Sequence, residues 1–134
     1  MNWKYIKELQ SLDLISEFEN TVNYKFCSEF VETVKNYNGA RPENSLFDTD
    51  KTEKRAIKSL LSFNKSDKET VWKIMDWNRT ELAGKYVAFG IDNFGNLICF
   101  SVENGNVIFL ECESLSIEMI AGDFTGFLSK LYSE

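Results

Sequence analysis

The second half of the chain contains three β-rich runs that are separated by two turn signals. The runs span 87–91, 97–102 and 107–111, and the turn signals span 92–96 and 103–106. The dipeptide Asn-Gly between apolar runs is a strong hairpin signal, because a type I′ turn needs a positive φ at both central residues. We therefore predict a three-stranded antiparallel meander over about residues 86–112, with Gly95, Asn104 and Gly105 at positive φ.

Apolar residues at helical spacing precede the meander. Residues 2–12 and 14–22 carry an apolar stripe that favours one or two amphipathic helices, the second of which begins at Asp13. A clearer helix begins at Ser28 and ends at Gly39, because glycine adopts the left-handed conformation at a helix end without cost.

Residues 40–55 are polar, and we expect a solvated loop there with a short buried anchor at Leu46 and Phe47.

Two stretches have the alternating pattern of strands. Residues 56–63 then alternate between apolar and polar side chains, which predicts a strand. The same alternation over 115–119 permits a short extra strand after the meander.

Capping signals mark two more helices. Residues 66–69 have the spacing of a capping box, so we expect a helix directly after them. Trp72 and Trp77 lie on different faces of that helix, so one of them is expected to be exposed. Asp123 is a suitable N-cap for a last amphipathic helix over 124–132.

This order of elements predicts an α+β fold. Helices and a mainly antiparallel sheet are segregated into layers, with helices before, between and after the strands. The chain has 134 residues, which is enough for a core without disulfides. We expect a single domain over residues 1–134.

Composition narrows the possible chemistry. The sequence has no histidine, which removes the commonest general base and the commonest metal ligand. Cys27, Cys99 and Cys112 are widely spaced without a Cys-x-x-Cys motif, so we expect reduced, mostly buried thiols and no zinc site. No apolar run approaches the roughly 20 residues of a membrane span, and the N-terminus lacks an apolar signal-peptide core. We therefore expect a cytoplasmic protein without a cofactor or a membrane partner.

The negative charge is concentrated near the C-terminus. The net charge of the chain is −6, and residues 87–134 alone carry one basic and seven acidic side chains. An acidic surface repels phosphate backbones, so nucleic acid is not an expected partner. It attracts a basic protein and speeds association. The alternative is that these side chains only keep a small domain soluble.

Three blocks of the sequence resemble the SUKH superfamily of Smi/Knr-like proteins. Residues 26–39 resemble the family helix that starts with Leu-Pro and ends in an aromatic residue followed by Asn-Gly. Residues 87–96 resemble its strand and turn, Pro-Phe-Ala-x-Asp-x-x-Gly-Asn, and residues 123–128 resemble its C-terminal Ser-Phe-x-x-Phe-Leu. With the shorter matches between them, the resemblance covers about residues 14–132.

Several positions depart from the family pattern. Phe26 and Cys27 stand where the family favours Leu-Pro, and Ala88 replaces the usual proline. Cys112 stands where a His-Glu pair is common, so only Glu113 of that pair remains. Residues 43–82 match the family poorly.

The resemblance implies a binding protein without catalysis. Bacterial members are typically immunity proteins, so the implied partner is the C-terminal toxin domain of a secreted or contact-delivered polypeptide. Such toxins are frequently nucleases, which are often basic, and an acidic inhibitor would cover the surface that binds phosphate. The expected partner-binding residues lie on the meander and just beyond it: Asp92, Asn93, Asn96, Glu103, Asn104, Glu111, Glu113 and Glu118.

Two other functions remain open. The first is an interaction or scaffold module in a regulatory assembly, as in some eukaryotic relatives. The second is an enzyme, for which only Cys112 between Glu111 and Glu113 offers chemistry. Neighbouring carboxylates raise the pKa of a thiol and keep it unreactive, and strand alternation puts Cys112 on the opposite face from both. For each proposed contact residue, an ordinary solvent-exposed role is the competing interpretation.

Overall fold

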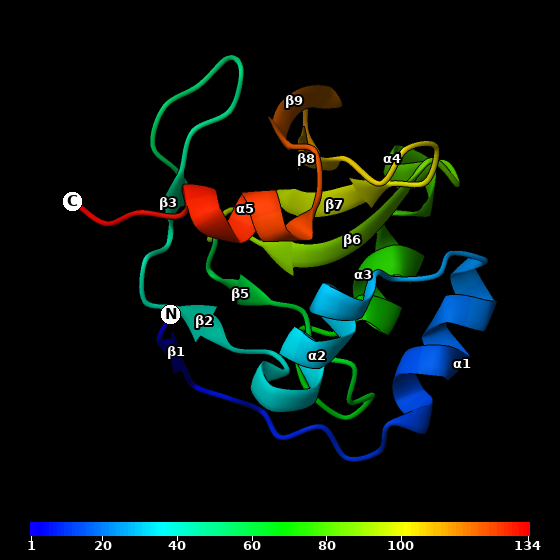
Figure 1. Ribbon diagram of the computed structural model, residues 1–134. Helices are drawn as coiled ribbons and strands as arrows, with labels where there is room; N and C mark the ends of the chain where they lie inside the picture. Colours follow the sequence, from blue (N-terminus) through cyan, green and yellow to red (C-terminus); the bar gives the residue numbers. More distant parts are fainter.

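A computed structural model describes residues 1–134 and shows a five-stranded antiparallel sheet with helices packed against it (Figure 1). The strands lie side by side in chain order: β5 (Ser59–Leu60), β6 (Tyr86–Ile91), β7 (Leu97–Ser101), β8 (Val107–Glu111) and β9 (Ser116–Ala121). The α+β fold and the three-stranded meander predicted over 86–112 are therefore confirmed. The extra strand permitted by the alternation over 115–119 is β9.

Five helices and two small ladders complete the fold. The helices are α1 (Asp13–Val22), α2 (Ser28–Tyr37), α3 (Val71–Trp77), α4 (Arg79–Leu82) and α5 (Phe124–Lys130). The ladders pair β1 (Trp3–Lys4) with β2 (Arg41–Pro42), and β3 (Leu46–Phe47) with β4 (Arg55–Ala56). None of the helices has both the length and the apolar character that crossing a membrane would require.

Phenylalanine rings join α2 and α5 to one face of the sheet. Phe30 of α2 lies 5.4 Å from Phe89, 5.2 Å from Phe100 and 5.1 Å from Phe124, measured between ring centroids. Phe89 and Phe100 stack across β6 and β7 at 4.4 Å. Aromatic pairs in such geometries stabilise a core beyond the area that they bury. As predicted, Asp123 caps α5, because its carboxylate accepts from the Gly126 amide at 2.7 Å.

The N-terminal segment is not helical over residues 2–12, so that part of the prediction is wrong. Two buried asparagine side chains hold its backbone instead. Asn38 Nδ2 donates to the carbonyl of Lys7 at 2.7 Å, and Asn64 Nδ2 donates to the carbonyl of Glu8 at 2.9 Å. Because these partners satisfy two of its carbonyl groups, the segment does not depend on helical hydrogen bonds there. Helix α1 does begin at the expected place, although no side chain caps it.

The strand predicted over 56–63 is shorter than expected. Only β4 and β5 form there, because the chain then turns back on itself. Ser62 makes a parallel bridge with Thr70, and its amide donates to the carbonyl of Glu69 at 3.0 Å. Tertiary pairing therefore overrides the local alternation after β5. The anchor at β3 is as expected, with Phe47 fully buried.

The predicted capping box does not cap α3. The N-cap is Thr70, whose Oγ1 accepts from the Lys73 amide at 3.1 Å. Ser66 lies in the preceding turn, and Glu69 forms an ion pair with Lys58 at 2.8 Å. The helix expected after residues 66–69 does form, but Thr70, directly before its first residue, caps it in place of Ser66.

The turn between β7 and β8 differs from the predicted type I′. Gly105 has a φ of 75°, but Asn104 keeps a negative φ. The hairpin closes with the Ser101 amide donating to the Asn106 carbonyl at 2.8 Å and the Gly105 amide donating to the Ser101 carbonyl at 2.7 Å. Four residues therefore lie in the loop, and loops of this length are usually built around a type I turn.

The cysteines and the two tryptophans of α3 differ in exposure. All three cysteines are free: Cys99 is buried, Cys112 is half-buried and Cys27 is exposed. The expectation of buried thiols is therefore wrong for Cys27. Trp77 is 66% exposed, whereas Trp72 packs against the core, as the different faces of the two side chains predicted.

Candidate functional site

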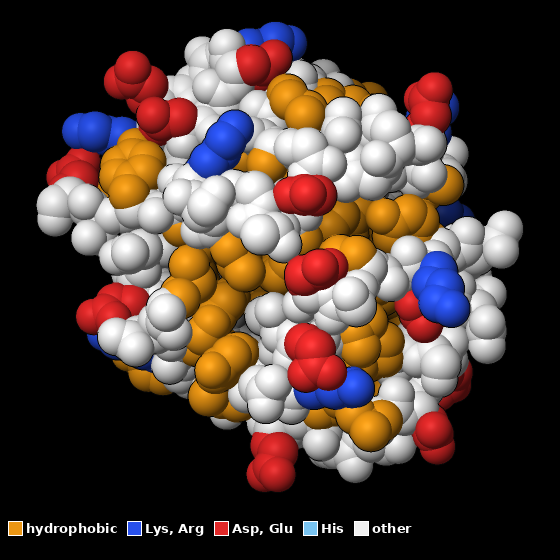
Figure 2. Space-filling model, viewed as in Figure 1, with side chains coloured by type: hydrophobic (Ala, Val, Ile, Leu, Met, Phe, Trp, Pro, Cys, Tyr) orange, Lys and Arg blue, Asp and Glu red, His pale blue; other side chains and the backbone are white.

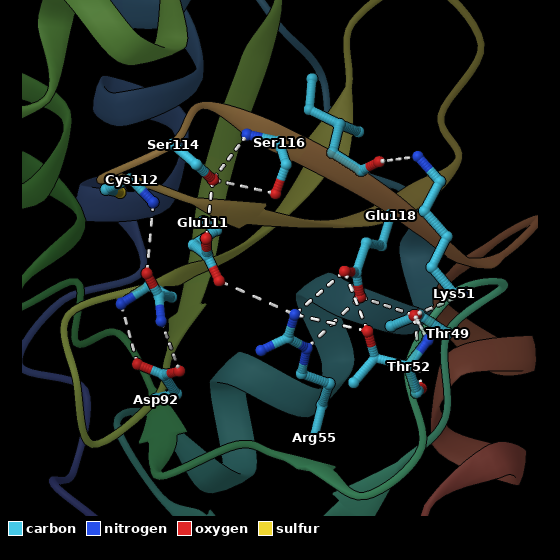
Figure 3. A network of polar contacts seen from close by, with 12 residues as sticks. Thr49, Lys51, Thr52, Arg55, Asp92, Glu111, Cys112, Ser114, Ser116 and Glu118 are labelled. Atoms are coloured by element: carbon cyan, nitrogen blue, oxygen red, sulfur yellow. Dashed lines mark hydrogen bonds and ion pairs between the residues drawn. The ribbon is translucent and has the colours of Figure 1, made fainter.

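The turn between β6 and β7 is held rigidly by one carboxylate. Asp92 Oδ1 accepts from the amides of Phe94 and Asn96, both at 2.8 Å, and Oδ2 accepts from Asn96 Nδ2 at 3.0 Å. Asn96 Oδ1 accepts in turn from the Cys112 amide at 3.2 Å, which ties this turn to the end of β8 (Figure 3). Gly95 supplies a φ of 85°. The turn presents Phe94 to solvent with 88% of its surface exposed.

The turn between β8 and β9 lies at the same end of the sheet, because antiparallel strands put alternate turns at the same end. Ser114 Oγ donates to Glu111 Oε1 at 2.7 Å, and the Leu115 amide donates to the Glu111 carbonyl at 2.8 Å. Leu115 has a φ of 61° and is 54% exposed. Glu113 is exposed and forms no ion pair. This turn therefore combines an exposed apolar side chain with a free carboxylate.

A compact polar cluster lies on β9 next to these turns. Arg55 donates to Glu118 through Nε at 3.3 Å and through Nη2 at 2.9 Å. Thr49 and Thr52 donate from their hydroxyls to the same carboxylate at 2.6 and 3.0 Å (Figure 3). The guanidinium carbon of Arg55 also lies 4.4 Å from the ring centroid of Phe109, the register partner of Glu118 on β8. Glu118 is therefore a buried anchor for the segment between β3 and β4.

The pKa values of this pair follow from its surroundings. Burial acts to raise the pKa of Glu118, but the hydrogen bonds from Arg55, Thr49 and Thr52 and the charge of Arg55 outweigh it and lower that pKa. The hydrogen bond to Glu118 raises the pKa of Arg55, and Glu111 adds to this effect from 3.8 Å. Both groups therefore stay charged around neutral pH.

The segment between β3 and β4 also covers the outer edge of β9. The Asp50 amide donates to the Met119 carbonyl at 2.9 Å, and Asp50 Oδ1 accepts from the Met119 amide at 2.8 Å. Lys51 donates to the Ile117 carbonyl at 3.3 Å. Covering an edge in this way removes a template for pairing with other chains.

The structure divides the eight predicted contact residues into three places. Those at the turn end of the sheet are Asp92, Asn93, Asn96, Glu111 and Glu113. Glu103 and Asn104 lie in the β7–β8 turn, at the opposite end of the strands, and Glu118 lies within β9. Asp92 and Glu118 are buried, and their carboxylates are occupied inside the protein. The set remains a prediction, and only part of it is available at one surface.

The pattern of charges on the side that Figure 2 shows does not single out a contact site. On the side that carries α2 and α5, acidic and basic side chains are interspersed and hydrophobic ones are visible between them (Figure 2). We therefore define the turn surface by position: it consists of Asn93, Phe94, Glu111, Glu113 and Leu115.

Three residues of this region were not predicted from the sequence. The exposure of Phe94 could be recognised from the sequence, because an aromatic side chain within an Asp-Asn-Phe-Gly-Asn turn lies away from the core. Leu115 breaks the polar character of its turn in the same way. Arg55 lies at the end of a charged run that reads as solvated loop, so nothing local distinguishes it.

The surroundings of Cys112 do not favour nucleophilic chemistry. Burial raises the pKa of the Cys112 thiol, and the carboxylates of Glu81 and Asp92 raise it further. These two, rather than the sequence neighbours Glu111 and Glu113, are the carboxylates that act on it. No three His, Cys, Asp or Glu side chains are grouped so that they could hold a metal ion.

A protein-family model described as SUKH_6, SMI1-KNR4 cell-wall, matches residues 12–128. The chain belongs to this SUKH family. The resemblance inferred from three sequence blocks is thereby confirmed, and the matched span includes residues 43–82, which resemble the family pattern poorly. No curated protein sequence matches the chain.

Proposed function

We propose that this SUKH protein is an immunity protein that binds a cognate toxin domain and blocks the active surface of that domain without catalysing a reaction. Membership of the SUKH family supports a protein-binding role in general. The net charge of −6 supports a basic partner, since opposite charge raises association rates. A nuclease toxin would have such a surface, and its inhibitor would act in the cytoplasm.

The turn surface is the contact site that we propose, and the exposure of Phe94 is the observation that carries this choice. An aromatic side chain that is 88% exposed has no role in the core of this chain. Aromatic residues, phenylalanine among them, are enriched at protein interfaces, where a few anchors provide most of the binding energy. The Asp92 hydrogen bonds fix the turn that presents it, so little conformational entropy is lost on binding.

The acidic side chains beside Phe94 and Leu115 give the surface its selectivity. Glu113 is exposed and unpaired, whereas Glu111 is half-buried and accepts from Ser114. A basic partner would meet two exposed apolar side chains and the unpaired carboxylate of Glu113 at the same end of the sheet. Apolar and polar groups are usually combined in this way at protein interfaces.

The alternative function is an interaction module in a regulatory assembly, and genomic context separates the two. An immunity gene should lie directly beside a gene for a large toxin. Cells that express the toxin domain of that neighbour should survive only when this protein is co-expressed. Phe94→Ser should abolish protection, whereas Glu103→Lys, at the opposite end of the strands, should retain it. Failure of the folded wild-type protein to protect would contradict the immunity proposal.

A further inference from the structure

A cavity of about 280 Å³ lies beside β5, at the edge of the sheet opposite β9. The residues that line it include Tyr5, Lys7, Arg41, Lys58 and Ser59. The cavity is several times larger than the share of one water molecule in liquid water, which is about 30 Å³. It therefore has room for a small ligand.

Segments that are distant in sequence form this cavity. The Lys7 amide donates to the Asn38 carbonyl at 2.8 Å, which holds the N-terminal segment against the end of α2. The Leu60 amide donates to the Ala40 carbonyl at 2.9 Å, which holds the start of β2 against β5. A Cβ atom added to Gly39 would lie only 3.1 Å from Cδ of Lys7, so the Lys7 stem lies directly on the backbone there. The fold thus sets the backbone positions of Lys7 and Arg41 and the course of the Lys7 stem.

The side chains that line the cavity carry more positive than negative charge. Lys58 pairs with Glu69 at 2.8 Å. Lys7 and Arg41 form no ion pair, and their charged groups make no hydrogen bond within the protein. The hydroxyl of Ser59 is also without a partner. In a chain with 21 acidic and 15 basic side chains, two neighbouring unpaired cations favour binding of an external anion.

We propose that this cavity binds the phosphate group of a small ligand. A guanidinium offers parallel donors that match phosphate oxygens, and a lysine ammonium adds a compact charge. Arg41 and Lys7 provide these two groups, and Ser59 provides a hydroxyl donor. A dianionic phosphate balances both unpaired cations, which a single carboxylate does not. The site is separate from the turn surface and does not depend on the immunity proposal.

Tyr5 provides a surface for the organic part of such a ligand. Its φ of 59° is unusual for a bulky residue, and its side chain is 75% exposed. Strained backbone of this kind is found preferentially at ligand sites. An aromatic ring beside a phosphate site can stack on a nucleobase. The ligand is therefore either free phosphate or a nucleoside monophosphate, which share the phosphate chemistry.

Titration of the ¹⁵N-labelled protein with inorganic phosphate, at constant ionic strength with chloride as the reference anion, tests the proposal. Saturable amide shifts should be confined to the segments around Lys7, Gly39 and Ser59. Arg41→Gln and Lys7→Gln should each weaken binding about tenfold, the effect of losing one charged hydrogen bond. Lys25→Gln is the control, because Lys25 is exposed and unpaired but lies outside the cavity.

The outcomes separate the possibilities. Absence of saturation, or equal losses with Lys25→Gln, would overturn the proposal, since phosphate would then bind only through general charge. Titration with adenosine monophosphate identifies the source of the phosphate. Tighter binding that Tyr5→Ala removes supports a nucleotide site, and equal binding supports free phosphate. Binding of adenosine monophosphate should weaken below the second pKa of its phosphate, which is about 6 for a phosphate monoester, because one negative charge is then lost.

Discussion

Arg55 and Glu118, which are 63 residues apart in the sequence, form a bidentate ion pair that attaches the segment between β3 and β4 to β9. The exposed fractions of the two side chains are 22% and 8%. Two threonine hydroxyls satisfy the remaining acceptor positions of the carboxylate. A partly buried pair of this kind destabilises the fold strongly when only one partner is removed, because the other charge is left unpaired.

Replacement of the carboxylate should therefore lower stability. We expect Glu118→Gln to reduce the free energy of unfolding by about 2 kcal/mol, the range for hydrogen bonds to charged groups. Urea unfolding should show a lower midpoint with an unchanged slope. Lys54→Met is the matched control, because Lys54 pairs with Glu134 while both side chains are more than 60% exposed. Such surface pairs contribute less than about 1 kcal/mol, so an equal effect of both substitutions would contradict the role given to Glu118.

The same carboxylate should make stability depend on pH. The pKa of Glu118 is lower in the folded protein than its ordinary value of 4.5, so the unfolded chain binds the proton more readily. Its stabilising contribution is present above pH 4.5 and is lost as the pH falls through the folded-state pKa. The difference in unfolding free energy between wild type and Glu118→Gln should shrink over that range. Urea unfolding at several pH values measures it, and a constant difference would show that Glu118 is not the titrating group.

Gly95 should be required for its backbone conformation alone. Its φ is 85°, and a Cβ atom placed there would have no neighbour within 4 Å. We expect Gly95→Ala to destabilise the fold by about 1 kcal/mol, the cost of a left-handed conformation. Gly122→Ala provides the comparison, since Gly122 also has open space but no positive φ. Thermal unfolding should show a loss only for Gly95→Ala, and a loss of equal size at Gly122 would exclude this explanation.

Substitutions on the turn surface should separate apolar anchoring from electrostatic attraction. Phe94→Ala should weaken toxin binding by about 2 kcal/mol, or roughly 30-fold, mainly through faster dissociation. Glu113→Lys should instead slow association and reduce its dependence on salt. Glu103→Lys makes the same change of charge at the opposite end of the strands and should leave both rates nearly unchanged. Surface plasmon resonance at low and moderate salt measures them, and equal effects at Glu113 and Glu103 would refute the proposed turn surface.

The meander was predictable because its signals are local. Continuous apolar runs and the turn residues between them, all within 86–112, indicate where each strand lies and where each hairpin turns. The N-terminal segment has a helical stripe, yet Asn38 and Asn64 hold it in a non-helical conformation from more than 30 residues away. The Arg55–Glu118 pair also joins residues that are far apart in the sequence. Period-two alternation alone would predict that Glu118 faces solvent.

The candidate site was predictable only in part for the same reason. Acidic residues of the meander can be counted from the sequence, but their availability depends on what lies opposite them in the fold. Asp92 is occupied by the turn that it closes, whereas Glu113 has no partner. The exposure of Phe94 follows from its position at a turn, but a turn position alone does not distinguish a contact residue from an ordinary surface residue.

Both outer edges of the sheet are occupied, by Asp50 and Lys51 at β9 and by the Ala40 carbonyl at β5. These contacts leave little room at Leu60, Ile117 and Met119 for an added strand, a mode of recognition in which main-chain bonds supply affinity almost irrespective of sequence. Recognition at the proposed turn surface would therefore rely on side chains of the β6–β7 and β8–β9 turns. Because Phe94 and Leu115 are exposed and lie outside the core, replacing them would change the partner that is bound and leave the packing that folds the chain intact.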